Sequence, residues 1–123
     1  MPVKVVDASA IGALVFGEPA AAEVVARLSG ATLAAPALLA FEIANVAVKK
    51  LRRHPEQRAA LLAAHAFSLR LPIESVAIDP AAVVSVAVET GLTAYDASYL
   101  WLARKLQADL VTLDAALNVA AGS

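Results

Sequence analysis

The sequence predicts an α/β fold in which a parallel sheet is covered by helices on both faces. Short apolar segments with the length of buried strands alternate with longer segments whose apolar residues recur at helical spacing. Such an alternation is typical of parallel strands joined by helices. The length of 123 residues is that of one ordinary domain, so residues 1–123 are expected to form a single domain.

The first half of the chain is expected to contain two strands and three helices. The segment Lys4–Val6 predicts a buried strand that passes at Asp7 into a short helix, and Gly17 stops this helix. The next predicted elements are a helix opened by Glu18-Pro19 that runs to about Leu28, a strand over Thr32–Ala35, and a helix from Pro36 to about Arg53.

The second half continues the same alternation. Pro55 is expected to start a helix over Glu56–Arg70, and Asp79 is expected to cap a helix that ends before Gly91. The other predicted elements are a strand over Ile73–Ile78, a helix that includes Tyr95–Leu106, and a last strand over Leu110–Leu113.

The chain is apolar, but it does not look like a membrane protein. Hydrophobic residues make up 60% of it and the mean hydropathy is +0.70. The longest uncharged segment, Leu28–Phe41, is nevertheless too short to span a bilayer and contains Pro36. The segment Met1–Asp7 lacks the features of a secretion signal, and the chain has no cysteine. We therefore expect a cytoplasmic protein without a membrane partner.

The charge balance excludes a broad basic surface for nucleic acid. The formal net charge is −1 and the sequence pI is about 6.1. Binding to RNA would have to be local, and Lys49, Arg52 and Arg53 could contact its phosphates. Basic residues at the end of a helix also complement the helix dipole, so their clustering has a purely structural explanation as well.

Four of the 11 acidic residues stand among almost exclusively apolar neighbours: Asp7, Glu42, Asp96 and Asp114. Asp7 and Asp114 fall at the carboxyl ends of predicted parallel strands, where open α/β sheets have their binding crevice. If Asp96 and Glu42 point into the same crevice, four carboxylates converge there, and their mutual repulsion requires a compensating cation. Oxygen ligands without His or Cys favour Mg²⁺ or Mn²⁺, which suit phosphodiester cleavage.

Each of these acids also has a structural interpretation. Asp7, Asp96 and Asp114 lie near helix starts, where carboxylates bind free N–H groups, and Thr93–Asp96 fits a capping box. Glu42 falls in the middle of its predicted helix, so it is not explained as a cap. It can instead begin a polar stripe with Asn45, Lys49 and Arg52, which is either solvated or lines a cleft.

Four segments in this order resemble PIN-domain ribonucleases and, within that family, the VapC toxins of toxin–antitoxin pairs. They are Val5–Ser9 at the first strand, Glu42 in the long helix, Tyr95–Leu100 in the later helix, and Leu110–Asp114 at the last strand. The resemblance extends from about Val3 to Leu117.

The resemblance implies a three-layer α/β/α fold with a central parallel sheet of four or five strands. It also implies that Asp7, Glu42, Asp96 and Asp114 form a Mg²⁺ or Mn²⁺ site, supported by Ser9 and Thr112. Members of the family commonly form homodimers and are inhibited by a cognate antitoxin protein. Only Val-Ala-Ala-Gly-Ser follow Asn118, so the fifth edge strand of many members is in doubt.

Two other classes of function remain open at this point. A strand-end aspartate such as Asp7 can accept a phosphoryl group, although Ala8 and Ser9 occupy the places where such domains carry a further acid. A PIN-like domain can also be a non-catalytic interaction module. The presence of all four acids gives no sign of lost activity, and a catalytic lysine after a late strand, which a phosphoryl-accepting domain needs, is missing.

Overall fold

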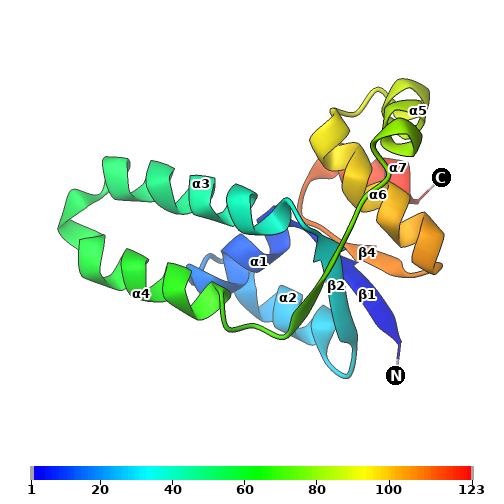
Figure 1. Ribbon diagram of the computed structural model, residues 1–123. Helices are drawn as coiled ribbons and strands as arrows, with labels where there is room; N and C mark the ends of the chain where they lie inside the picture. The colour runs from blue at the N-terminus through cyan, green and yellow to red at the C-terminus, as the bar shows by residue number, and fades with distance from the viewer. Residues whose placement is uncertain (1, 123) are drawn as a thin grey trace.

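The structure, a computed structural model, describes residues 2–122 and contains one four-stranded parallel sheet within that range (Figure 1). Its strands have the order β3-β2-β1-β4. In chain order they are β1 (Val3–Val6), β2 (Thr32–Pro36), β3 (Ile73–Val76) and β4 (Asp109–Val111). The predicted fold class and sheet are thereby confirmed, with four strands across residues 2–122.

Helices cover the sheet in three groups (Figure 1). The first, α1 (Ala8–Val15) and α2 (Ala21–Leu28), lies on one face. On the other face α6 (Ala94–Leu106) packs against β1 and β2, and it is flanked by α5 (Pro80–Thr90) and α7 (Ala115–Ala121). The third group is a helical hairpin of α3 (Leu39–Arg53) and α4 (Arg58–Ser68), joined by the 3₁₀ turn η1 (Pro55–Gln57).

The central strand β1 is buried on both faces. Val5 and Val6 point to opposite sides of the sheet, and neither exposes any surface to solvent. Leu102 and Tyr99 of α6 fill the core on one side, and Ile11 of α1 belongs to the same core. This packing fixes the carboxyl end of β1, where Asp7 follows. None of the helices within residues 2–122 has the length and apolar character needed to cross a membrane.

The predicted start of the long helix at Pro36 is wrong. Pro36 is the last residue of β2, and α3 begins at Leu39. The Ala37 N–H still donates to the Val76 carbonyl of β3 at 3.2 Å. Because successive N–H groups of a strand point to opposite sides, the missing N–H of Pro36 faces β1, and pairing with β1 has already ended at Ala34.

Other element boundaries also differ from the prediction, and α2 begins only at Ala21 instead of at Glu18-Pro19. Glu56 lies in η1, so α4 begins only at Arg58 and ends at Ser68. The third strand stops at Val76, and the last strand spans Asp109–Val111. The predicted cap at Asp79 and the stop at Gly91 are confirmed: Asp79 accepts from two backbone N–H groups, and Gly91 has a φ of 75°.

Candidate functional site

Asp7 lies at the carboxyl end of β1, and hydrogen bonds hold both oxygens of its carboxylate. Its side chain is only 5% exposed. The Ser9 hydroxyl and the Ala10 backbone N–H donate to Oδ1, at 2.7 and 3.0 Å. The Thr112 hydroxyl donates to Oδ2 at 2.5 Å. Asp7 therefore caps α1, as the structural interpretation expected, and is also fixed from the neighbouring strand end.

Ser9 and Thr112 connect the ends of β1 and β4. The Leu113 N–H donates to Ser9 Oγ at 2.9 Å, and the Asp114 N–H donates to Thr112 Oγ1 at 3.0 Å. These side-chain acceptors replace sheet partners at Leu113 and Asp114, so β4 ends at Val111 although the apolar run continues to Leu113. The two hydroxyls thus hold the backbone of Asp114 beside the carboxylate of Asp7.

Asp114 caps α7 but is not buried. Its Oδ1 accepts from the Leu117 N–H at 2.8 Å. Its apolar sequence neighbours suggested a shielded charge, whereas the residue is exposed, as is Leu113. The strand end therefore presents this carboxylate at the surface of the site, with one oxygen used by the cap.

Asp96 lies in the first turn of α6, but its carboxylate is not the cap of that helix. Thr93 Oγ1 accepts from the Asp96 N–H at 3.2 Å, which is one half of the predicted capping box. No bond from the Thr93 N–H back to the Asp96 carboxylate is found within residues 2–122. Burial raises the pKa of Asp96, and the negative charges of Asp114 and Asp7 raise it further.

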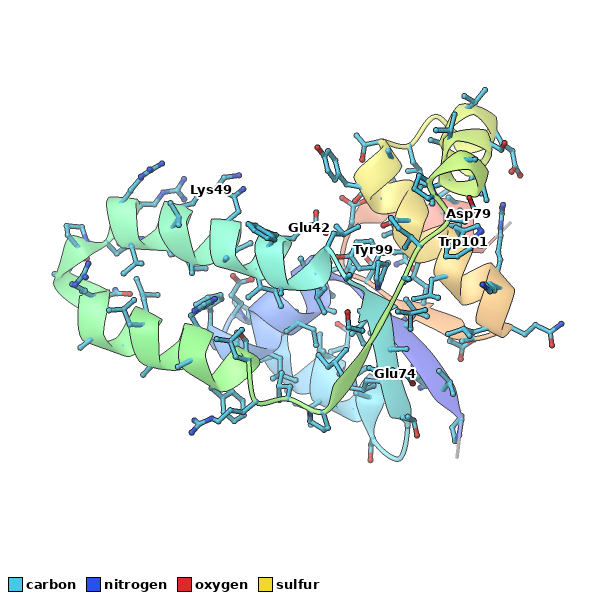
Figure 2. The ribbon with its side chains drawn as sticks, in the orientation of Figure 1. Glu42, Lys49, Glu74, Asp79, Tyr99 and Trp101 are labelled. Carbon is cyan, nitrogen blue, oxygen red and sulfur yellow. The ribbon has the colours of Figure 1, made fainter. Side chains whose placement is uncertain are left out.

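Glu42 lies in the first turn of α3, because the helix begins later than predicted. The Tyr99 hydroxyl of α6 donates to Glu42 Oε1 at 2.5 Å, and Figure 2 shows the two side chains between α3 and α6. Burial raises the pKa of Glu42, the bond from Tyr99 lowers it, and the charges of Asp96 and Asp7 raise it again, with a net increase. The polar-stripe interpretation is therefore insufficient for Glu42.

Electrostatic influences link the four carboxylates in pairs. The negative charges of Asp96 and Asp7 raise the pKa of Glu42, and those of Asp114 and Asp7 raise the pKa of Asp96. The ion pairs found in the described part of the chain involve other acids: Glu18, Glu56 and Glu89. We refer to Asp7, Glu42, Asp96 and Asp114 as the acid cluster. Its negative charge is uncompensated by a paired Lys or Arg within residues 2–122.

The acid cluster does not form a complete metal-binding site in this arrangement. Across residues 2–122, no group of three or more His, Asp or Glu side chains is arranged so that it could hold a metal ion as it stands. The chemistry of the donors nevertheless fits Mg²⁺ or Mn²⁺, since all of them are carboxylate oxygens. A carboxylate offers about four lone-pair sites, of which Asp7 uses three.

The remaining predicted site residues follow α3 away from the acid cluster. Asn45 is exposed and lines a hollow with Glu42. Lys49 and Arg53 line a second hollow near Glu18, and Arg52 is exposed. Lys49 lies seven residues beyond Glu42, or about 10 Å along the helix axis. The structure therefore does not bring these bases into the acid cluster, and Figure 2 shows Lys49 farther along α3.

Tyr99 is the functional candidate that the sequence reasoning missed. Its helical spacing with Leu102 identified it as a core residue, and its side chain is indeed only 1% exposed. Its hydroxyl, however, bonds Glu42 from another helix, and burial followed by this bond raises the tyrosine pKa. The sequence feature that could have identified it is its position three residues after Asp96, which places both residues on the same side of α6.

Comparison with known proteins supplies a family and two related folds. Residues 4–123 match the PIN domain family. The crystal structure of PAE2754 from Pyrobaculum aerophilum superposes with a TM-score of 0.78 at 31% identity, over 97% of this chain and 79% of that one. Mycobacterium tuberculosis VapC20, a sarcin-ricin loop cleaving toxin, has a TM-score of 0.68 at 15% identity, over 95% and 94% of the two chains. No significant match was found among curated proteins.

Proposed function

Because this chain belongs to the PIN domain family, we propose that it is a divalent-metal-dependent endoribonuclease that hydrolyses RNA phosphodiester bonds at the acid cluster. The observation that supports the proposal is the electrostatic influence that Asp7, Asp96 and Asp114 exert on Glu42 or Asp96, without an ion pair to any of the four acids within residues 2–122. Such a cluster destabilises the protein by self-repulsion unless it binds positive charge. Membership of a nuclease family and the all-oxygen donor set support the same function.

Asp7, Asp96, Asp114 and Glu42 would hold the ion, which we propose to be Mg²⁺ or Mn²⁺. When bound, such an ion lowers the pKa of a water molecule and stabilises the charge that develops on the phosphate. Asp7 is the fixed member, because Ser9 and Thr112 orient both of its oxygens. Asp114 is exposed and Asp96 and Glu42 are partly exposed, so these three can adjust when the ion binds.

The unequal environments of the carboxylates suggest different roles. A carboxylate with a raised pKa accepts a proton more readily than an ordinary one, which suits a general base near neutral pH. Glu42 has such a pKa, and Tyr99 orients its side chain through the bond to Oε1. We assign Glu42 the removal of a proton from the attacking water, and Asp7 the positioning of the reacting centre.

We further propose that the protein acts in the cytoplasm as the toxin of a toxin–antitoxin pair. The structural likeness to VapC20, described as a toxin, motivates this role. An antitoxin has reason to place an arginine at the acid cluster, because a guanidinium binds carboxylates in bidentate fashion and competes with the metal. The neighbouring gene product should therefore co-purify and inhibit cleavage. If it does neither, the toxin role is excluded while the nuclease remains.

Cleavage of structured RNA by the purified protein tests the enzymatic proposal. Activity should require Mg²⁺ or Mn²⁺, disappear with EDTA, and be abolished by Asp96→Asn. Asp109→Asn is the matched control, because Asp109 is an exposed acid at the opposite end of β4. Cleavage that persists both in EDTA and in Asp96→Asn would exclude the proposal.

A non-catalytic interaction module is the second candidate function. It is favoured because no complete metal-binding site is formed within residues 2–122. Calorimetric titration with Mn²⁺ separates the two functions. A nuclease should bind the ion and lose binding in Asp96→Asn, whereas an interaction module has no need of it. A phosphoryl-accepting role fits less well, because Asp7 is buried and both of its oxygens already accept hydrogen bonds.

A further inference from the structure

A shallow hollow of about 320 Å³ lies directly beside the acid cluster, between the first turns of α3 and α6. Its lining consists of Leu38, Phe41, Glu42, Asn45 and Tyr95. Glu42 belongs both to this hollow and to the acid cluster, and Tyr95 immediately precedes Asp96 in the chain. A group that enters the hollow is therefore adjacent to the proposed site of cleavage.

Two aromatic side chains of the hollow are unusually exposed. Phe41 is 84% exposed and Tyr95 is 66% exposed, although phenylalanine is among the residue types most often fully buried. They stand on different helices, and the bond between Tyr99 and Glu42 links these two helices close to both rings. The rings are therefore held at the site by the fold without being part of the core.

Polar groups continue from this hollow along α3. Asn45 is exposed in the hollow, and its amide can both donate and accept hydrogen bonds. Lys49 is exposed about one further turn along the helix and lies beside Arg53 in the next hollow. The order along α3 is thus an aromatic ring at Phe41, a carboxylate at Glu42, an amide at Asn45, and then positive charge.

We propose that the hollow between Phe41 and Tyr95 is a base-binding subsite, in which an unpaired RNA base beside the cleaved phosphate stacks on the rings while Asn45 bonds its edge. Stacking on aromatic side chains is the usual way in which proteins bind single-stranded nucleic acid. The inference rests on the proposed ribonuclease function and adds to it a position beside the cleaved phosphate at which one base is bound. Bases within a duplex are already stacked and do not reach such rings.

An apolar face of another protein is the competing occupant of the hollow. The position of Glu42 argues against it, because covering this carboxylate with apolar atoms would remove it further from water without a compensating partner. A nucleotide instead supplies polar edges for Asn45 and a phosphate whose charge Lys49 can balance. The mixed lining therefore favours RNA.

The test is binding of a cleavage-resistant phosphorothioate hexaribonucleotide that carries one 2-aminopurine, measured by fluorescence in Mg²⁺ buffer. The parent should quench the fluorophore and bind the single strand more tightly than the same sequence in a duplex. Phe41→Ala and Tyr95→Ala should each weaken binding by about 5- to 150-fold and reduce the quenching. Tyr95→Phe should retain both, since it keeps the ring. Val88→Ala, at an apolar residue of α5 that is 80% exposed, is the control and should leave binding unchanged.

Several results would overturn the base-binding subsite. The first is failure of the parent protein to bind the hexamer. The second is binding by Phe41→Ala and Tyr95→Ala that equals binding by the parent. The third is weakening by Val88→Ala as large as that caused by the two aromatic substitutions. Loss of self-association in Phe41→Ala with unchanged quenching would assign the hollow to a protein interface instead. The two proposals fail separately. If the rings bind RNA but the parent shows no EDTA-sensitive cleavage, only the ribonuclease function is refuted. If the parent cleaves RNA but both alanine variants bind it as the parent does, only the base-binding subsite is refuted.

Discussion

The hydroxyl of Tyr99 donates to Oε1 of Glu42 at 2.5 Å and so joins α6 to α3 at the edge of the acid cluster. Tyr99 is almost fully buried, while Glu42 is half-buried and belongs to the acid cluster. The bond stabilises the ionised form of Glu42 against the burial and repulsion that raise its pKa. It is therefore both a structural link and a means of adjusting the proposed general base.

Tyr99→Phe should shift the acidic limb of the pH–rate profile to higher pH. Removal of the donor leaves only the influences that raise the pKa of Glu42, so a higher pH is needed to ionise it. Loss of a hydrogen bond to a charged group should also reduce the free energy of unfolding by about 1.5–3 kcal/mol. The measurements are kcat/KM against pH and a denaturant melt. Tyr95→Phe, at the exposed tyrosine of the same helix, should change neither the limb nor the stability.

Asp96→Asn and Asp7→Asn should have opposite effects on stability in EDTA. Asp96→Asn removes the repulsion between Asp96 and the neighbouring carboxylates. It breaks no hydrogen bond to the Asp96 carboxylate, because none is found within residues 2–122, so the melting temperature of the variant should equal or exceed that of the parent. Asp7→Asn disturbs three bonds and the α1 cap, so we expect a loss of about 1–3 kcal/mol. Both should be inactive. Clear destabilisation of Asp96→Asn would show that its carboxylate is structural.

The fold was largely predictable, because each strand and helix is specified by local patterns. Val5 and Val6 form a continuous apolar pair, as expected for a strand buried on both faces, and both are fully buried. Errors occurred where tertiary pairing decides the boundary. Pro36 is a common residue in the first turn of a helix, yet here β3 still pairs with the adjacent Ala37 and keeps Pro36 in the strand.

The sequence neighbours of the four acids were enough to select them as candidates, but they did not predict the environment of each carboxylate. The flanking residues of Asp114 are apolar, but the strand end presents it to solvent. Glu42 is bonded by Tyr99, 57 positions away in the chain, and no local pattern contains such a contact. Tyr95 and Leu106 share the helical spacing of core residues but are exposed, since spacing identifies a face without showing whether anything covers it.

Acidification should stabilise the metal-free protein. The pKa values of Glu42 and Asp96 are raised in the folded state, so that state binds protons more tightly than the unfolded chain. Stability should therefore rise as the pH falls from neutrality to about pH 4, where the unfolded carboxyl groups also become protonated. Melts in EDTA should show this slope, and saturating Mg²⁺ should reduce or reverse it.

Glu42→Gln should flatten the pH slope in EDTA, because it removes one of the two groups that cause it. Glu74→Gln serves as the control, since Glu74 is an exposed acid on β3 that takes no part in the acid cluster (Figure 2). A metal-free protein whose stability instead falls steadily from pH 7 to pH 4 would contradict the repulsion argument.

Thr112→Val should lower both stability and activity. Thr112 is fully buried, and the substitution removes the bonds to Asp7 and to the Asp114 N–H while the volume stays nearly constant. Leaving the buried Asp7 Oδ2 and the part-buried Asp114 N–H without this partner should cost about 1–3 kcal/mol. Ser9→Ala should couple to it in a double-mutant cycle, because both hydroxyls bind Asp7. Thr32→Val, at an exposed threonine, is the control, and strict additivity of the Ser9 and Thr112 changes would refute a shared network.

The hairpin of α3 and α4 should form the surface through which the protein dimerises. It extends away from the sheet in Figure 1, and it exposes apolar side chains on α4 and just beyond it: Leu62, Phe67 and Leu69. Several exposed apolar side chains on one hairpin favour a protein interface, and a second copy is the commonest partner in homo-oligomers. We therefore predict a homodimer by light scattering at micromolar concentration.

Leu69→Lys, at a leucine that is 64% exposed, should give a folded monomer, whereas Val88→Lys on the exposed face of α5 should remain dimeric. A parent that is monomeric at this concentration, or a Leu69→Lys variant that still dimerises, would contradict the assignment of this surface.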